Sequence, residues 1–156
     1  MTVLGLISDT HGLLRPEAVD ALCGVDQILH AGDVGAPEIL NRLETIAPVT
    51  AVRRNVDGGA WARKLPLSEV VEVDGMSIYM LHILEKLDLK PEAAGFSAVI
   101  YGHSHVPKIE KKNDVLYFNP GSAGPRRFKL PITVGKLIVD AKKLHAEIIE
   151  LAVMRE

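Results

Sequence analysis

Two histidines stand one residue apart in the segment Ile-Tyr-Gly-His-Ser-His, which spans residues 100–105. They follow an apolar run that ends at a glycine. Such a pair arises by chance in a chain with six histidines, or it binds a metal ion through its imidazole nitrogens. The metal hypothesis requires further ligands, which must come from other parts of the chain.

Similar polar clusters follow other predicted strands. Together with the histidine pair, the clusters are Asp9-Thr10-His11, Gly32-Asp33, Asn55-Val56-Asp57, His82 and His103-Ser104-His105. In open α/β sheets, ligands bind beyond the carboxyl ends of the strands, and every cluster occupies such an end. The clusters offer oxygen and nitrogen donors without sulfur, a set that suits Mn, Fe, Zn, Ni or Co. Seven candidate ligands exceed what one tetrahedral ion needs and indicate two ions that share a carboxylate: Asp9, His11, Asp33, Asn55, His82, His103 and His105.

Each cluster alone has an ordinary structural explanation. A histidine such as His82 at a strand end is commonly a core or rim residue. Gly32-Asp33 is a typical turn, and Asn55 is a typical loop residue. The joint occurrence of five such segments, each at the end of a predicted strand, favours a metal site.

Alternating strands and helices are predicted to position these clusters. The first third of the chain predicts parallel βαβ units, with strands at 2–8, 26–30 and 48–53 and helices at 16–22 and 37–45. In the remainder, we predict a helix at 91–94 and a strand at 98–101. Three hairpins are also predicted, formed by 70–73 with 76–82, by 106–110 with 115–118, and by 133–139 with 144–151. We therefore expect one mixed α/β domain over residues 1–156, with two sheets.

The composition narrows the class of protein. A net charge of −2 argues against a protein that tracks a nucleic acid backbone. The single cysteine, Cys23, excludes an internal disulfide and suits a reducing compartment. No apolar run approaches the ~20 residues of a membrane-spanning helix, and the first residues resemble a strand rather than a leader. We expect a cytoplasmic protein that does not bind membranes.

As a set, the clusters resemble those of the calcineurin-like metallophosphoesterases, and especially their small bacterial and archaeal phosphodiesterase branch, which includes a retromer subunit. The resemblance runs from Val3 to Phe118 and through the turn Asn119-Pro120-Gly121-Ser122. It implies a four-layer α/β/β/α sandwich of two mixed β-sheets with a dinuclear centre at one edge. It also implies that Asp33 bridges two ions, the first held by Asp9, His11, Asp33 and His105 and the second by Asp33, Asn55, His82 and His103.

The segment around Asn55 departs from the family pattern. Arg54 stands where the family usually has glycine, and Val56 stands where it has histidine or cysteine. A histidine there is thought to protonate the leaving group, so Val56 predicts a preference for activated esters. Arg54 is a candidate phosphate contact. Asp57 either orients a ligand histidine or is a plain loop acid.

The resemblance implies a phosphodiesterase that hydrolyses small phosphate esters with a metal-bound hydroxide. We expect Asp33, Asn55, Asp57 and Arg54 to be its catalytic residues, Arg54 by its chemistry rather than by the resemblance. Two divalent ions are its expected cofactors, Mn first among the metals named above. A phosphomonoesterase or nucleotidase with the same site stays open, as does a scaffold like the retromer subunit. A homo-oligomer, phosphate contacts by Arg126 and Arg127, and a supporting role for His30 also stay open.

Overall fold

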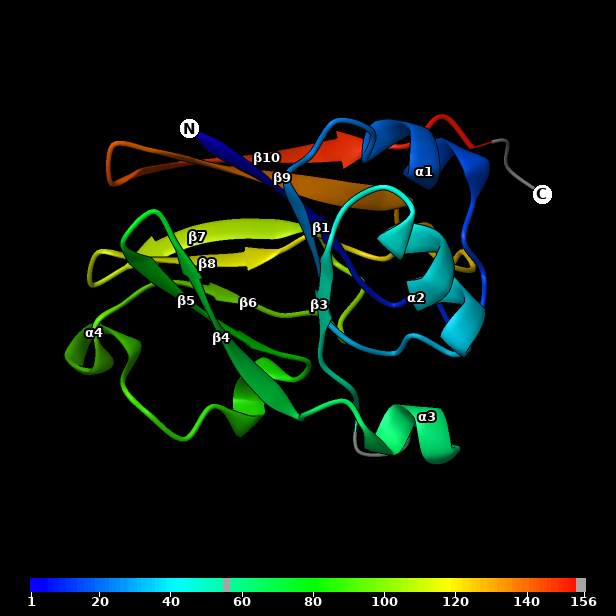
Figure 1. The fold of residues 1–156 in the computed structure, drawn as a ribbon, viewed down its shortest axis with the longest axis horizontal. Helices are drawn as coiled ribbons and strands as arrows, with labels where there is room; N and C mark the ends of the chain where they lie inside the picture. Colours follow the sequence, from blue (N-terminus) through cyan, green and yellow to red (C-terminus); the bar gives the residue numbers. More distant parts are fainter. Residues whose placement is uncertain (55–56, 154–156) are drawn as a thin grey trace.

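The computed structural model describes residues 1–54 and 57–153, which form two stacked five-stranded sheets with short helices on their outer faces (Figure 1). The order of strands is β10-β9-β1-β2-β3 in the first sheet and β4-β5-β6-β8-β7 in the second. The elements are β1 (Thr2–Ile7), α1 (Pro16–Ala21), β2 (Gln27–His30), α2 (Pro37–Glu44), β3 (Val49–Ala51), α3 (Ala60–Arg63), β4 (Ser68–Val73), β5 (Met76–Leu81), the 3-10 turn η1 (Leu84–Lys86), α4 (Pro91–Ala94), β6 (Phe96–Ile100), β7 (Lys108–Lys112), β8 (Val115–Asn119), β9 (Thr133–Asp140) and β10 (Lys143–Glu150).

Both sheets are mixed, as expected. In the first sheet β1, β2 and β3 run parallel, while β9 pairs antiparallel with β1 and β10. In the second sheet β5, β6 and β8 run parallel, and β4 and β7 are antiparallel edge strands. Helices α1 and α2 pack on the outer face of the first sheet, and η1 packs on that of the second. The expected α/β sandwich is therefore confirmed.

The main core lies between the two sheets. Leu4 and Leu6 of β1 meet Met80, Ile100 and Phe118 of the second sheet there, and all five side chains are fully buried. Alternation along β1 turns the intervening residues toward α1. One of them is a glycine, because a Cβ at Gly5 would lie 2.7 Å from Cδ2 of Leu22.

The predicted strands and helices all appear, with ends that differ by a few residues. The final hairpin, β9-β10, extends the first sheet through β1. Two short elements, α3 and η1, lie in segments for which no element was predicted. Within residues 1–54 and 57–153, no helix combines the length and apolar character needed to cross a bilayer.

Backbone hydrogen bonds extend beyond the strand ends and tie the polar loops together. Asp9 N donates to Gly32 O over 3.0 Å, and His11 N donates to Asp33 O over 2.9 Å. In the second sheet, Gly102 N donates to the backbone carbonyl of His82 over 3.0 Å. The loops after β1, β2, β5 and β6 are thereby held at one edge of the sandwich.

Candidate metal centre

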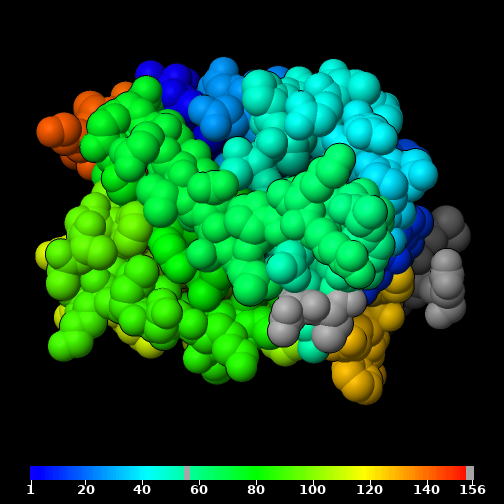
Figure 2. Space-filling model, turned by 60° about the horizontal axis from the view of Figure 1, so that its bottom comes forward, coloured from blue at the N-terminus to red at the C-terminus, as the bar shows by residue number. Residues whose placement is uncertain are grey.

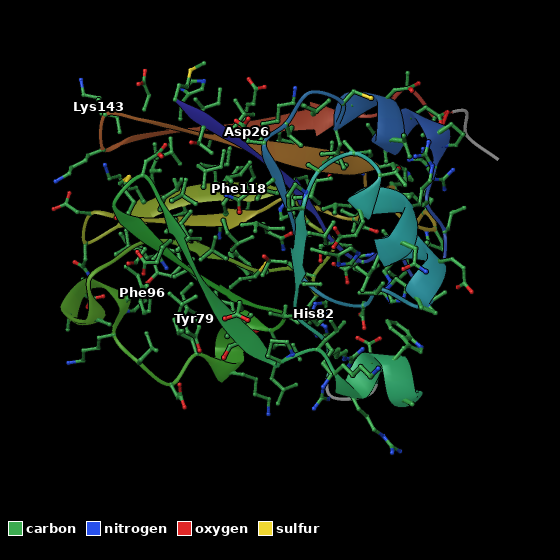
Figure 3. The ribbon with its side chains drawn as sticks, viewed as in Figure 1. Asp26, Tyr79, His82, Phe96, Phe118 and Lys143 are labelled. Carbon is green, nitrogen blue, oxygen red and sulfur yellow. The ribbon has the colours of Figure 1, made fainter. Side chains whose placement is uncertain are left out.

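Two groups of candidate ligands meet at this edge. Asp9, His11 and His105 form one group, and Asp33, His82 and His103 form the other; within each group the ligand atoms lie within 4.8 Å of one another. Each group combines residues from both sheets. His82 lies where the loops of the two sheets meet, just beyond β5 (Figure 3).

The two groups are in direct contact through the two aspartates. Asp33 Oδ2 lies 3.1 Å from His82 Nε2 and 3.6 Å from His11 Nε2. Asp9 Oδ1 lies 3.4 Å from His105 Nε2, 3.7 Å from His82 Nε2 and 3.8 Å from His11 Nε2. Asp33 therefore contacts histidines of both groups, as a shared ligand would.

Several of these buried atoms lack a hydrogen-bond partner among the described protein groups. They are Asp9 Oδ1, His82 Nε2 and His105 Nδ1. The other carboxylate oxygen of Asp9 accepts from Ser8 Oγ at 2.7 Å and from His103 N at 3.2 Å. The oxygen Oδ1 of Asp9 therefore faces the histidines and has no hydrogen-bond donor in the described part of the chain. Buried polar atoms are rarely left unpartnered, so this arrangement fits a bound cation.

The ring of His82 is oriented for ligation by its other nitrogen. Its Nδ1 donates to the carbonyl oxygen of Ala31 over 2.7 Å, since a carbonyl can only accept. In the neutral ring, Nε2 then carries the lone pair, and it lies 3.1 Å from Asp33 Oδ2 without hydrogen-bond geometry. A hydrogen bond from the distal nitrogen to a carbonyl is the usual support for a metal-binding histidine.

The backbone around the candidate ligands is strained. Five of them adopt the left-handed conformation, with φ angles of 56° at Asp9, 46° at His11, 54° at Asp33, 74° at His103 and 65° at His105. Such conformations cost about 1–3 kcal/mol each and are retained where surrounding structure enforces them, often at functional sites. Gly35 (φ +93°) belongs to the same loops, because a Cβ there would collide with the backbone of His11 and Gly12.

The electrostatics of the site depend on Asp33. Burial raises the pKa of Asp33, but His82, His11 and Arg54 outweigh burial and lower this pKa to about 2. For His82 the balance is reversed: burial lowers its pKa, whereas Asp33 and Asp9 raise it further than burial lowers it. The two aspartates thus favour positive charge at His82, as they would favour a cation beside them.

The Asn-Pro-Gly-Ser turn packs against the loops that carry the ligands. Asn119 Nδ2 donates to Gly102 O over 3.2 Å and to Ser104 Oγ over 3.0 Å, and Ser122 Oγ donates to Asp9 O over 3.1 Å. Sequence reasoning identified this turn but not its contacts. They hold the backbone on either side of His103 and at Asp9.

Arg54 and Asp57 lie beside the site, at the end of the first sheet. Arg54 Nη1 is 3.8 Å from Asp33 Oδ2, and its side chain is 35% exposed, so it is within reach of a ligand at Asp33. The carboxylate of Asp57 accepts from Arg54 N over 2.9 Å and closes the loop; its described contact is with the backbone rather than with a ligand histidine. Asn55 and Val56 lie outside the described residues.

Arg126 and Arg127 were candidates for phosphate contacts. Arg126 Nη1 donates to the carbonyl of Leu130 over 3.1 Å and lines a cavity with Glu150. Arg127 is exposed on the same loop. Neither makes a described contact with the candidate ligands, so Arg54 is the arginine that the geometry associates with the site.

His30 is fully buried behind the site and held as one tautomer. Thr10 Oγ1 donates to Val34 O over 2.8 Å, so it must accept from His30 Nε2 at 3.0 Å, while His30 Nδ1 accepts from Gly32 N at 3.1 Å. Burial lowers the pKa of His30 to about 4, chiefly through desolvation. The neutral ring links the loops that bear Asp9 and Asp33.

The lowered pKa of His30 predicts a loss of stability in mild acid. In the unfolded state His30 is protonated as the pH falls below about 6.5, whereas in the folded state it is protonated only below about pH 4. The free energy of unfolding therefore decreases as the pH falls across this window. We expect the native protein to lose about 2 kcal/mol more than His30→Gln between about pH 7.5 and pH 5. Urea denaturation of both proteins in chelator measures the difference; equal pH slopes would contradict the assigned environment of His30.

Comparisons with known proteins identify the family of this chain. The sequence profile of the calcineurin-like phosphoesterase superfamily domain matches residues 1–142. A probable metallophosphoesterase of Methanothermobacter thermautotrophicus is 38% identical, over 94% of this chain and 91% of its own length. An archaeal phosphodiesterase structure superposes with a TM-score of 0.79 at 25% identity, covering 96% of this chain and all of its own. Vps29 of Chaetomium thermophilum, at 18% identity and a TM-score of 0.77, shares the fold over 97% of both chains. This chain belongs to the calcineurin-like phosphoesterase superfamily.

Proposed function

We propose that this protein is a metal-dependent phosphodiesterase that uses two adjacent divalent ions to hydrolyse small phosphate esters. The observation that carries the proposal is the pair of buried, unpartnered ligand atoms, Asp9 Oδ1 and His82 Nε2, which lie 3.7 Å apart beside the carboxylate of Asp33. Two cations, one beside each atom and both beside Asp33, would satisfy both atoms. The similarity to a structurally characterised archaeal phosphodiesterase supports the choice of reaction.

In this proposal Asp33 would be the ligand shared by the two ions. Asp9, His11 and His105 would complete one position, and Asn55, His82 and His103 would complete the other. When bound, the ions would supply a nucleophilic water of lowered pKa and neutralise charge on the phosphoryl oxygens. Oxygen and nitrogen donors accept Mn, Fe, Zn, Ni or Co, and we propose Mn as the first to test.

The protein's own residues have three tasks in this proposal. The hydrogen bonds from Ser8 and the His103 backbone fix one oxygen of Asp9, so that the other faces the ions. The contact of His82 with Ala31 fixes its ring. Arg54, 3.8 Å from Asp33, binds a non-bridging phosphoryl oxygen of the substrate and stabilises charge that develops on it.

The proposal is tested by comparing two chromogenic esters. We expect the protein with Mn²⁺ to hydrolyse bis-p-nitrophenyl phosphate with a kcat/KM about tenfold or more above that for p-nitrophenyl phosphate, and to lose both activities in chelator. Faster hydrolysis of the monoester would favour a phosphomonoesterase. Absence of hydrolysis with every metal named above, at full metal occupancy, would favour a scaffold.

A further inference from the structure

A cavity of about 350 Å³ adjoins the candidate metal centre. Arg54 and His82 line it, and both lie beside Asp33, so the cavity and the site share a wall. Its other walls come from the start of β4, from β5 and from η1, and include Tyr79 and Lys86, which are not candidate ligands. Tyr79 lies within β5 and His82 lies just beyond its end (Figure 3). The segment 60–95, which carries most of the lining, forms much of the face in Figure 2.

The cavity carries an excess of positive charge. Arg53, Arg54 and Lys86 line it against one carboxylate, that of Asp88. Arg54 also lies 3.8 Å from Asp33 and is assigned above to the scissile phosphate, so Arg53 and Lys86 are the cations left for a second anion. The Nε of Arg53 donates to Leu65 O over 2.9 Å, which orients its guanidinium. Within residues 1–54 and 57–153, neither Arg53 nor Lys86 has a carboxylate at ion-pair distance. A phosphate monoester, which is anionic at neutral pH, suits this pair of cations.

The remaining walls are largely apolar and fixed. The ring of Tyr79 packs on Phe96, with ring centroids 5.1 Å apart, and Leu67 offers an apolar surface that is 49% exposed. A volume of about 350 Å³ exceeds that of a lone phosphate and falls in the usual range for small-molecule sites, about 300–1,000 Å³. The cavity therefore suits an alcohol group with a ring and a second anionic group.

We propose that this cavity binds one alcohol group of the substrate, and that the preferred substrates are diesters whose alcohol carries a second phosphate, as in a nucleoside 3′-phosphate. This inference rests on the proposed function, because the scissile phosphodiester sits at the metal centre while the second phosphate contacts Lys86 and Arg53. Substrate specificity then depends on Lys86 and Arg53, which are not candidate metal ligands.

The test compares thymidine 5′-(p-nitrophenyl phosphate) with the same ester bearing a 3′-phosphate, at equal ionic strength with Mn²⁺. Both release p-nitrophenolate, so their reactivity is matched and only the second phosphate differs. We expect native kcat/KM to favour the 3′-phosphate ester by about tenfold or more, as for a charge-assisted contact. Lys86→Ala should move this ratio toward one, whereas Lys90→Ala, an exposed lysine outside the cavity, should keep the native ratio.

A native ratio near one, or equal ratios in Lys86→Ala and Lys90→Ala, would overturn the assignment of the cavity. Failure of the proposed function gives a different result, because the native protein would then leave bis-p-nitrophenyl phosphate intact. If the proposed function fails, the cavity can still be tested by calorimetry, which measures the affinity of the metal-free protein for thymidine 3′,5′-bisphosphate. We expect Lys86→Ala to weaken this binding and Lys90→Ala to leave it unchanged; equal affinities would refute the inference.

Discussion

Replacing Asp33 by asparagine is expected to lower Mn²⁺-dependent hydrolysis of bis-p-nitrophenyl phosphate by at least about 100-fold. Asp33 Oδ2 lies 3.1 Å from His82 Nε2 and 3.6 Å from His11 Nε2, and so contacts both candidate groups. The asparagine has the same shape but no charge, so the two ions of the proposed centre would lose the carboxylate that they share. Metal content at equilibrium should fall together with kcat.

The backbone conformation at Asp33 lets asparagine replace aspartate without a change of fold, so the substitution removes only the charge. Its φ of 54° is left-handed, and asparagine adopts this conformation as readily as aspartate. The variant should therefore fold, and its circular dichroism should match that of the native protein. Asp20→Asn, an exposed carboxylate of α1, is the matched control and should retain native activity. Equal activity of both variants would remove Asp33 from the proposed centre.

The strain at the site explains how metal binding and folding are connected. Five candidate ligands hold left-handed backbone angles, and their loops are joined by hydrogen bonds between neighbouring strand ends and from Asn119 and Ser122. In the metal-free protein these contacts help to maintain the geometry. A cation that binds the unpartnered ligand atoms would increase the stability of the fold, since a ligand that binds only the folded state stabilises it.

The location of the site could be predicted because it depends on strand order and strand ends. Short apolar runs such as 2–8 and 26–30 are evident from composition, and parallel strands bring their carboxyl ends to one edge. A polar residue that directly follows such a run, such as Asp9 or Asp33, must then lie at that edge. The same reasoning brought His82 and His103 there from the second sheet, where β5 and β6 are also parallel.

Other features depend on side-chain contacts between distant segments, which periodicity does not contain. The tautomer of His30 is set by Thr10 and the Gly32 amide, and the orientation of Asp9 is set by the amide of His103, 94 residues away. Arg126 was a reasonable phosphate contact by residue type, but the path of its loop turns it onto Leu130. The short elements α3 and η1 are similarly too brief for a periodic signal.

The second large effect concerns Gly102, which has no candidate ligand atom of its own. We expect Gly102→Ala to weaken metal binding by about 10–100-fold and to destabilise the fold by about 1–3 kcal/mol. An added Cβ would collide with Ser8 Oγ and lie 2.8 Å from Asp9 Oδ2. That carboxylate oxygen is the one held by Ser8 and His103, so the collision turns Asp9 away from the histidines.

Gly58→Ala is the matched control, because a Cβ at Gly58 meets no atom of the described residues within 4 Å and neither glycine needs a left-handed backbone. Both variants lose the same backbone freedom of the unfolded chain, so a difference in stability between them reports on the contacts at Ser8 and Asp9. Calorimetric titration with Mn²⁺ measures the affinity, and urea denaturation in chelator measures the stability. If Gly102→Ala lost stability but bound Mn²⁺ as tightly as Gly58→Ala, then Asp9 would not be a ligand whose orientation matters. The paired aspartates could then not form the centre proposed above.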